Sequence, residues 1–358
     1  MKKILIDLSA LYNIYSGLGQ VALSYGRYFA KHYKADKTGY RLYLLLPKKY
    51  FGAFGNEIRY ISSDSWWRRH SRYLFPKIDV WHSIDQITRF KPYSTKTKHI
   101  ITIHDLNYLY EEKDAKKRAT AQRRIQRTIK RTNQIVCISD FTKREVERNF
   151  RLDGKLCRVI YNHVKPLDVS RARKPDIDIR TPFFFAIGVL AEKKNFHVLL
   201  DLMKLLPEKH LYIAGKDNYV GGLPAPYADM IRKRIDSENI DNITLMGGIS
   251  DEEKIWMYRH CEAFLIPSLL EGFGLPVIEA MQAGKPVFSS PKTSLEEIGN
   301  RFAFFWNNFD AQTMKKVIDD NLEEFYRNAS LIEEQRKYAA SFATDRHFEE
   351  YEQLYSTI

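Results

Sequence analysis

The fold is decided by the stretch Glu271-Gly-Phe-Gly-Leu-Pro-Val-Ile-Glu279-Ala-Met-Gln-Ala-Gly284. Pro276 suits the start of a helix, where its missing N–H group costs nothing, and Gly284 suits the left-handed residue that ends one. A helix of about two turns is therefore predicted, opened by the loop Gly272–Leu275, whose N–H groups form an anion site. We expect Glu279 in the first helical turn and Glu271 on the loop, as two acceptors that flank one phosphate-sized space and suit a pair of neighbouring hydroxyls. The alternative is a plain helix start with acids that complement the helix dipole.

Length and composition place this stretch in a two-domain globular protein. A chain of 358 residues exceeds one ordinary core, and 44% hydrophobic with 28% charged residues is typical of a folded protein. The three cysteines show no metal spacing and are odd in number, which favours reduced thiols in the cytoplasm. The longest apolar run, 183–191, is about half the ~18 residues of a membrane-spanning helix.

Charge is divided unevenly along the chain. Residues 1–165 contain 34 Lys and Arg against 14 Asp and Glu, whereas the rest of the chain contains 23 against 30. This asymmetry predicts that the first half meets an anionic surface and that the second half binds a small ligand.

The first half alternates apolar strands with helices, which predicts a doubly wound parallel sheet. A strand at 3–8 leads into the glycine loop 15–20, and a helix is expected from about 21 to 32. His82, His104-Asp105 and Ser139-Asp140 end three strands and are interpreted either as functional groups or as satisfied structural residues. Further strands are expected at 40–46, 58–62, 80–83, 99–104, 135–139 and 157–161, with helices at 114–132 and 141–150.

The second half repeats the pattern after a polar, proline-containing segment, 166–182, which we interpret as the linker between domains. The predicted architecture is α/β: two doubly wound, Rossmann-like domains at 1–165 and 183–341 that face a central cleft. The tail 342–358 is expected to be another helix. Strands are expected at 183–190, 210–214, 243–246, 263–267 and 285–289, with helices at 195–206, 227–238, 251–261, 311–326 and 330–342.

Other residues of the second half point to the same ligand. Gly188 follows its first strand and precedes Lys193-Lys194-Asn195 at the start of the next helix. Two lysines there oppose the helix dipole unless an anion lies between them, so they predict a phosphate site, with a solvated turn as the alternative. Gly247-Gly248 follows another strand and either lies against a planar base or is a simple turn into the next helix.

These motifs together resemble the retaining family-4 glycosyltransferases of GT-B fold. The stretch from Pro267 to Met281, with Ala283–Val287, resembles their two-glutamate motif. Gly188 with Lys193-Lys194-Asn195 resembles their donor-diphosphate motif, and Gly17-Leu18-Gly19 resembles their N-terminal glycine loop. His104-Asp105, the helix entry at 138–145 and the tail 342–351, which in the family crosses back onto the first domain, are similar as well. The resemblance is specific over 183–300 and weakest over 47–98.

The resemblance implies a role for each matching residue. Lys194, assisted by Lys193, neutralises the departing diphosphate, and Glu279 accepts the ribose hydroxyls. Glu271 orients the transferred sugar, and His104 contacts that sugar. The remaining donor-binding positions are Gly17, Gly19, Gly188 and Gly248, with the backbone N–H groups of Phe273, Gly274 and Leu275. Where many members have Arg, this chain has Lys193, which lacks a planar fork for bidentate binding.

The chemistry of such a site needs fixed positive charge at the leaving group, which the two lysines and the loop amides supply. The sequence shows no Asp-rich metal cluster, so neither a metal nor a cofactor is expected besides the sugar-nucleotide substrate. Glu271 and Glu279 do not resemble the acid and nucleophile of a hydrolase. The family resemblance implies transfer with retention, in which the leaving phosphate helps to deprotonate the acceptor.

In the basic half, the helix expected at 114–132 has a wide cationic face and a narrow apolar face. The narrow face is formed by Ala121, Ile125, Thr128 and Ile129. The segment Ser65–His70 places Trp66 and Trp67 beside arginines. Aromatic and basic residues in this mixture are typical of surfaces that bind anionic lipid, and a solvated face is the alternative. No nucleic-acid-binding module accompanies the charge. The basic residues of the helix include Arg123, Arg124 and Arg127.

We therefore expect a cytoplasmic hexosyltransferase, peripheral on the inner face of the membrane, that extends a lipid-linked or surface polysaccharide. The Lys-Asn form of the phosphate motif favours GDP-mannose as donor. No other feature of the sequence specifies the nucleotide base, the sugar or the linkage formed. The alternatives are a nucleotide-sugar epimerase or phosphorylase on the same fold, and a non-enzymatic basic protein that binds lipid or nucleic acid.

Overall fold

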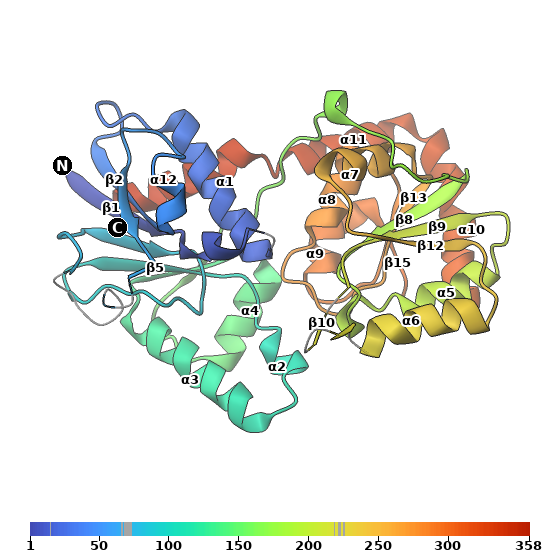
Figure 1. The fold of residues 1–358 in the computed structure, drawn as a ribbon, viewed down its shortest axis with the longest axis horizontal. Coiled ribbons are helices and arrows are strands. Elements are labelled where there is room, and N and C mark those ends of the chain that lie inside the picture. Colours follow the sequence, from blue (N-terminus) through green and yellow to red (C-terminus); the bar gives the residue numbers. More distant parts are fainter. Residues whose placement is uncertain (15, 66, 68–73, 218, 221–222, 225) are drawn as a thin grey trace. The chain divides into compact units, whose positions relative to one another are not determined.

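The computed structural model describes residues 1–14, 16–65, 67, 74–217, 219–220, 223–224 and 226–358. The chain forms two compact units (Figure 1). Unit 1 comprises Met1–Tyr161 with His347–Ile358, and unit 2 comprises Asn162–Arg346. Each unit is a parallel-sheet, Rossmann-like α/β domain, as the alternating pattern predicted.

Unit 1 contains a seven-stranded parallel sheet in the order β3-β2-β1-β4-β5-β6-β7. The central strands read as apolar runs because helices cover both faces of the sheet. All seven predicted strands of this half are present. They are β1 (Lys2–Asp7), β2 (Tyr40–Leu46), β3 (Arg59–Ser62), β4 (Val80–Ser83), β5 (Lys98–Ile103), β6 (Gln134–Cys137) and β7 (Cys157–Val159).

The alternation of side chains along β5 shows which helices cover which face. Ile101 and Ile103 pack with residues of α3 and α4, whereas Ile100 joins the cluster formed with α1 and α12. Because successive side chains point to opposite faces, the two pairs of helices lie on opposite sides of the sheet. The helices of unit 1 are α1 (Gly17–His32), α2 (Tyr108–Glu111), α3 (Ala115–Arg131), α4 (Asp140–Asn149) and α12 (Thr344–Thr357), with short 3-10 turns at Ser9–Asn13 and Lys48–Tyr50.

The C-terminal helix α12 is fixed to the sheet of unit 1 by a buried polar network. His82 lies 2.6 Å from the Tyr355 hydroxyl through Nδ1 and 2.8 Å from the Thr102 hydroxyl through Nε2. The Thr102 hydroxyl is 2.9 Å from that of Tyr351. Burial lowers the pKa of His82 well below its ordinary value, so the ring is uncharged. Of the two interpretations of His82, the structural one is therefore right.

Unit 2 contains a six-stranded parallel sheet in the order β12-β9-β8-β13-β14-β15. Five of its strands were predicted, and the edge strand β15, helix α9 and the hairpin β10–β11 were not, because each is short. The strands are β8 (Phe183–Ile187), β9 (His210–Ala214), β10 (Tyr219–Val220), β11 (Leu223–Pro224), β12 (Ile243–Gly247), β13 (Ala263–Ile266), β14 (Val287–Ser289) and β15 (Ala303–Phe305). The helices are α5 (His197–Lys204), α6 (Pro226–Ser237), α7 (Asp251–His260), α8 (Leu275–Gln282), α9 (Ser294–Gly299), α10 (Ala311–Arg327) and α11 (Ala329–Ala340), with 3-10 turns at Val169–Arg171, Glu192–Lys194 and Asn300–Phe302.

The segment 166–182, which the sequence suggests as a linker, is packed along unit 2. Arg171 forms an ion pair with Glu252, and the N–H of Arg173 donates to the Glu252 carbonyl over 3.1 Å. The N–H of Arg180 donates to the hydroxyl of Tyr212 over 2.8 Å. Contacts with α7 and β9 therefore order this polar segment, whose composition alone resembles a free connection.

Candidate active site

Glycines mark the carboxyl ends of three neighbouring strands in unit 2, β8, β9 and β12. A Cβ atom on Gly215 would lie 1.9 Å from the carbonyl oxygen of Gly188, so the two main chains touch and admit no side chain. The side chain of Lys194 packs against Gly188, and that of Lys216 packs against Gly248. In each case a Cβ atom placed on the glycine would lie 3.1 Å from Cε of the lysine. Ligands of doubly wound sheets bind at such strand ends, where these two lysines are placed.

The loop before α8 has the glycine geometry that the sequence predicts. Gly274 adopts φ +105° directly before the helix, and Gly284 adopts φ +69° just after it, which confirms the left-handed stop. The helix begins at Leu275, with Pro276 in its first turn. Glu279 is the fifth residue of the helix and lies just beyond the first turn, which contains no acidic residue, so its expected position was wrong by one residue. The cause is that the helix starts before the proline.

Two hydroxyl residues that sequence analysis missed hold this loop in place. The hydroxyl of Ser294 donates to the carbonyl oxygens of Glu271 and Phe273 over 3.0 and 2.9 Å. The hydroxyl oxygen of Thr293 accepts from the N–H of Glu271 over 3.1 Å. Both residues lie at the start of α9, a short helix with no strong pattern in the sequence, so only the fold reveals their contact with the loop.

Lys194 and Glu271 form an ion pair in the structure. Nζ of Lys194 donates to Oε1 of Glu271 over 2.6 Å, and each side chain is only 14% exposed. Lys193 and Lys194 lie in a separate 3-10 turn, which the left-handed residue Asn195 divides from α5. The lysines therefore lie just ahead of the helix, as expected, but in a turn of their own and not at the helix start where the dipole would act on them. The anion that compensates Lys194 in the structure is a carboxylate of the protein itself.

Glu279 is held by two residues of α7 that sequence analysis did not single out. Nζ of Lys254 donates to Oε1 over 2.7 Å, and the hydroxyl of Tyr258 donates to Oε2 over 2.9 Å. Burial acts to lower the pKa of Lys254, but the Glu279 carboxylate raises it, and the net shift is upward. Burial and the same carboxylate raise the pKa of Tyr258 well above its ordinary value. Their spacing, four residues apart on one helix, was the only indication in the sequence.

Gly17 and Gly19 belong to the first turn of α1, not to a loop before the helix as expected. The hydroxyl oxygen of Ser16 caps the helix by accepting from the N–H of Gly19 over 3.0 Å. A Cβ on Gly19 would lie 2.0 Å from the carbonyl oxygen of Asn13. Gly19 therefore has a packing reason to be glycine, and the capping serine shifts the helix start N-terminally.

His104 follows β5 in unit 1 and is oriented by its neighbours. Its Nε2 atom lies 2.7 Å from the carbonyl oxygen of Ile84, and its main-chain N–H donates to the side-chain oxygen of Gln86 over 3.1 Å. Because a carbonyl only accepts, Nε2 carries the proton of this contact. Ser139, at the end of β6, instead caps α4 by accepting from the N–H of Thr142.

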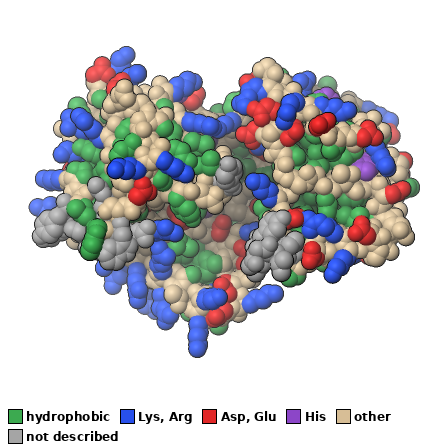
Figure 2. Space-filling model, viewed as in Figure 1, with side chains coloured by type: hydrophobic (Ala, Val, Ile, Leu, Met, Phe, Trp, Pro, Cys, Tyr) green, Lys and Arg blue, Asp and Glu red, His purple; other side chains and the backbone are tan. Residues whose placement is uncertain are grey.

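Helix α3 has the cationic face that the sequence predicts, and Figure 2 shows Lys and Arg side chains gathered over this part of unit 1. Ile125 and Ile129 are fully buried, and among the described residues no large exposed apolar side chain lies on α3. Arg124 has a structural role, because its guanidinium donates hydrogen bonds to the main-chain carbonyl oxygens of Ile87 and Thr88. Trp67 is 68% exposed, whereas Trp66 and residues 68–70 lie outside the described part of the chain.

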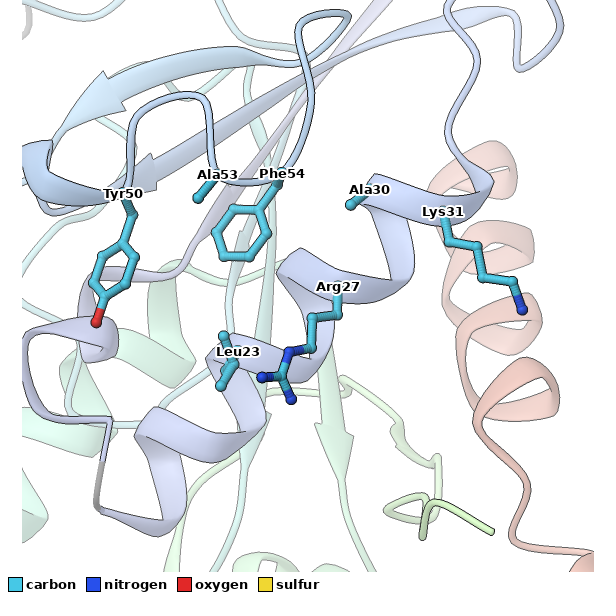
Figure 3. A pocket seen from close by; sticks show the side chains of 7 residues that line it. All are labelled: Leu23, Arg27, Ala30, Lys31, Tyr50, Ala53 and Phe54. Carbon is cyan, nitrogen blue, oxygen red and sulfur yellow. The ribbon is translucent and has the colours of Figure 1, made fainter. Parts of the chain in front are cut away.

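Unit 1 also contains an open pocket of about 510 Å³ between α1 and the turn after β2 (Figure 3). Gly26 allows the ring of Phe54 to pack against the helix, because a Cβ there would lie 2.5 Å from that ring. None of the residues expected in the donor site lines this pocket. Its lining residues are Leu23, Arg27, Ala30, Lys31, Tyr50, Ala53 and Phe54.

Two Rossmann-like parallel-sheet domains are the architecture of GT-B glycosyltransferases. Residues 21–166 match the family model described as Glycosyltransferase Family 4, and residues 171–338 match that described as Glycosyl transferases group 1. The chain belongs to the family-4 glycosyltransferases of GT-B fold.

Curated relatives are similar at low identity. The O-antigen chain mannosyltransferase RfbU of Salmonella typhimurium is 24% identical over 226 residues, 63% of this chain and 60% of that protein. The O-antigen chain mannosyltransferase B of Escherichia coli is 26% identical over 213 residues, 56% of this chain and 54% of that one. The matched region thus spans about three fifths or less of these relatives.

Solved structures share the fold over the whole chain. Sucrose-phosphate synthase of Thermosynechococcus elongatus superposes with a TM-score of 0.74 at 15% identity, covering 99% of this chain and 98% of that one. Anabaena Alr3699/HepE in complex with UDP and glucose superposes with a TM-score of 0.70 at 14% identity, covering 100% of both. At these identities the likeness establishes the fold alone.

Proposed function

We propose that this glycosyltransferase transfers mannose from GDP-mannose to a lipid-linked or surface polysaccharide of the O-antigen kind, with retention of configuration. Support for mannose and for a polysaccharide acceptor comes from the relatives, which are named as O-antigen chain mannosyltransferases. The Lys194-Asn195 form of the phosphate motif favours the same donor.

The observation that carries the proposal is the ion pair between Lys194 and Glu271 beside Gly188. Bond cleavage leaves a diphosphate whose growing negative charge must be met by fixed positive groups. In our assignment Lys194 meets it, with Lys193 and the N–H groups of residues 273–275 at the start of α8. Glu271, paired with Lys194, accepts hydroxyls of the transferred sugar and orients it.

The remaining roles are those that the family resemblance implies for each residue. Glu279 binds the ribose hydroxyls, and the main chain at Gly248 lies against the base. For unit 1, the resemblance assigns His104 to a hydroxyl of the donor sugar, and Gly17 and Gly19 to the diphosphate.

Retention and independence of metal are part of the proposal. Glu271 and Glu279 are each tied to a different lysine, which is unlike the paired acid and nucleophile of a glycoside hydrolase. The leaving phosphate then takes the proton of the acceptor hydroxyl on the same face of the sugar. Positive charge from the two lysines and the α8 amides takes the part that a divalent cation plays in other transferases.

A donor panel tests this function. The enzyme is incubated with GDP-mannose, GDP-fucose, UDP-glucose and UDP-N-acetylglucosamine and a polysaccharide-repeat acceptor, with and without EDTA. We expect GDP-mannose to be used at least tenfold faster than the others, equal rates with EDTA, and an α-linked product by NMR. Preference for a UDP-sugar would overturn the donor assignment, a β-linked product would overturn retention, and loss of activity in EDTA would overturn independence of metal. Release of free sugar or a phosphorylated sugar without acceptor transfer would instead favour a hydrolase or a phosphorylase.

We further propose that the cationic face of α3 binds an anionic membrane surface, which would place the enzyme at the inner face of the membrane. None of the helices in the described part of the chain is long and apolar enough to span a bilayer. The α3 face lacks large exposed apolar residues, so the attraction is expected to be mainly electrostatic, at about 1 kcal/mol for each basic residue near the surface.

Neutralising four exposed basic residues of α3 should abolish most binding to anionic vesicles. Glutamine at these positions is expected to reduce co-sedimentation at least tenfold, and wild-type binding should weaken as salt shortens the screening length from ~30 Å to ~8 Å. Arg124 is left intact because its guanidinium holds main-chain carbonyls. The positions are Arg123, Arg127, Lys130 and Arg131.

A matched variant removes four positive charges from exposed ion pairs on unit 2, where each pair contributes ~0–1 kcal/mol to stability. Its vesicle binding should change less than twofold. Equal losses in both variants, or binding that is independent of lipid charge, would return α3 to the solvated-face interpretation. The control positions are Arg301, Lys316, Arg327 and Lys337.

A further inference from the structure

Two side chains of one helix hydrogen-bond to the Glu279 carboxylate. Lys254 and Tyr258 lie four residues apart on α7, so both project toward α8. Lys254 donates to one carboxylate oxygen and Tyr258 to the other, over 2.7 and 2.9 Å. The carboxylate is thereby fixed at both oxygens, and with it the torsion angles of the glutamate.

The two contacts leave Glu279 with capacity for a diol. An ionised carboxylate offers about four lone-pair sites, two on each oxygen. Each of the two protein donors occupies one site on its own oxygen. One site on each oxygen remains, which matches a pair of neighbouring hydroxyls and no more.

We infer that Lys254 and Tyr258 are positioning residues that orient the Glu279 carboxylate for the vicinal hydroxyls of the nucleoside ribose. The inference rests on the proposed assignment of Glu279 to ribose. A carboxylate that is already ordered loses no further conformational freedom when the ribose arrives, and this preorganisation strengthens binding. Lys254 also compensates the charge of a carboxylate that is only 16% exposed.

The surroundings of Tyr258 allow its hydroxyl to be removed without loss of packing. The residue is fully buried, and its ring contacts Phe185 edge-on, with centroids 5.2 Å apart, and Phe264 at 5.4 Å. Tyr258→Phe keeps these ring contacts and deletes only the hydrogen bond to Glu279. A purely structural role, joining α7 to α8, would weaken every ligand of this site to the same extent.

The test pairs the protein variants with a change in the ligand. GDP and 2′,3′-dideoxy-GDP, which lacks the ribose diol, are titrated by calorimetry into wild type, Tyr258→Phe and Lys254→Met. Each variant should bind GDP ~5- to 10-fold more weakly, as expected when the Glu279 side chain is no longer ordered before the ligand binds. Affinity for the dideoxy ligand should change less than twofold. The UDP pair is titrated alongside, so the inference does not depend on the identity of the base.

A second tyrosine provides a matched control. Tyr212 is also buried in unit 2, and its hydroxyl contacts the main chain of residues 178 and 180 instead of a site carboxylate. Tyr212→Phe should leave the ratio of the two affinities unchanged. An equal loss for both ligands in Tyr258→Phe and Lys254→Met, or no loss for either ligand, would overturn the inference.

Glu279→Ala separates this inference from the assignment on which it depends. If that variant no longer distinguishes the two ligands while Tyr258→Phe and Lys254→Met still do so fully, the ribose assignment stands and the positioning role is wrong. If Glu279→Ala distinguishes them as well as wild type does, the ribose assignment itself is wrong.

Discussion

Replacing Lys194 by alanine is expected to lower kcat by ~10²–10³-fold, the effect of losing one fixed group that stabilises charge in the transition state. In our assignment this ammonium meets the diphosphate as the glycosyl bond breaks, so the loss should appear in kcat more than in KM for the donor. The measurement is initial-rate kinetics at saturating donor. Retention of more than about a third of wild-type activity would refute the phosphate assignment.

The ion pair with Glu271 requires a control for stability. Lys194→Ala leaves the 14%-exposed Glu271 without its partner, which can cost about 1–3 kcal/mol in the free energy of unfolding. The double variant Lys194→Met/Glu271→Gln removes both charges and should recover most of that stability while remaining inactive. A double variant that recovered activity would show that Lys194 acts only by neutralising Glu271. Lys316→Ala removes an exposed lysine of α10 that has no assigned part in transfer and should leave kcat within about threefold.

The second large effect separates the two glutamates by what each one binds. Glu279→Ala is expected to weaken GDP binding ~10²-fold, because two hydroxyl hydrogen bonds to a charged acceptor are lost. Glu271→Ala should leave GDP affinity within about threefold and lower kcat by ~10²-fold, because its assigned partner is the transferred sugar, which GDP lacks. Calorimetry with GDP and steady-state kinetics with GDP-mannose measure the two quantities.

The contrast between the glutamates is the discriminating result. Equal losses of GDP affinity would place both carboxylates on the nucleotide and remove Glu271 from the sugar. Glutamine variants at both positions provide a control for packing, since they preserve volume and change only charge and donor capacity. We expect the same order of effects with smaller losses.

Much of the fold depends on residues that are close together in the sequence, so it could be predicted from the sequence. Several features of the sequence are local, because each depends on the backbone conformation of a few adjacent residues. They are the apolar strand runs, the proline in the first turn of α8, the glycine that follows α8, and the glycines after β8 and β12. For that reason the two parallel-sheet domains and the short helix α8 were predicted. The boundaries moved where a local competitor had been overlooked, as when Ser16 caps α1 and draws Gly17 and Gly19 into the helix.

Only the tertiary structure decided which partner each charged residue takes. Lys194 and Glu271 are 77 positions apart, and Lys254 and Glu279 are 25 apart; no spacing in the sequence encodes such pairs, because they arise when separate strand-end loops and helices meet. The same holds for the network that joins His82 to Tyr355 across 273 positions and gives a strand-end histidine a structural task. Local chemistry thus selected the residue types of the site, and the packing of distant elements determined which of them touch.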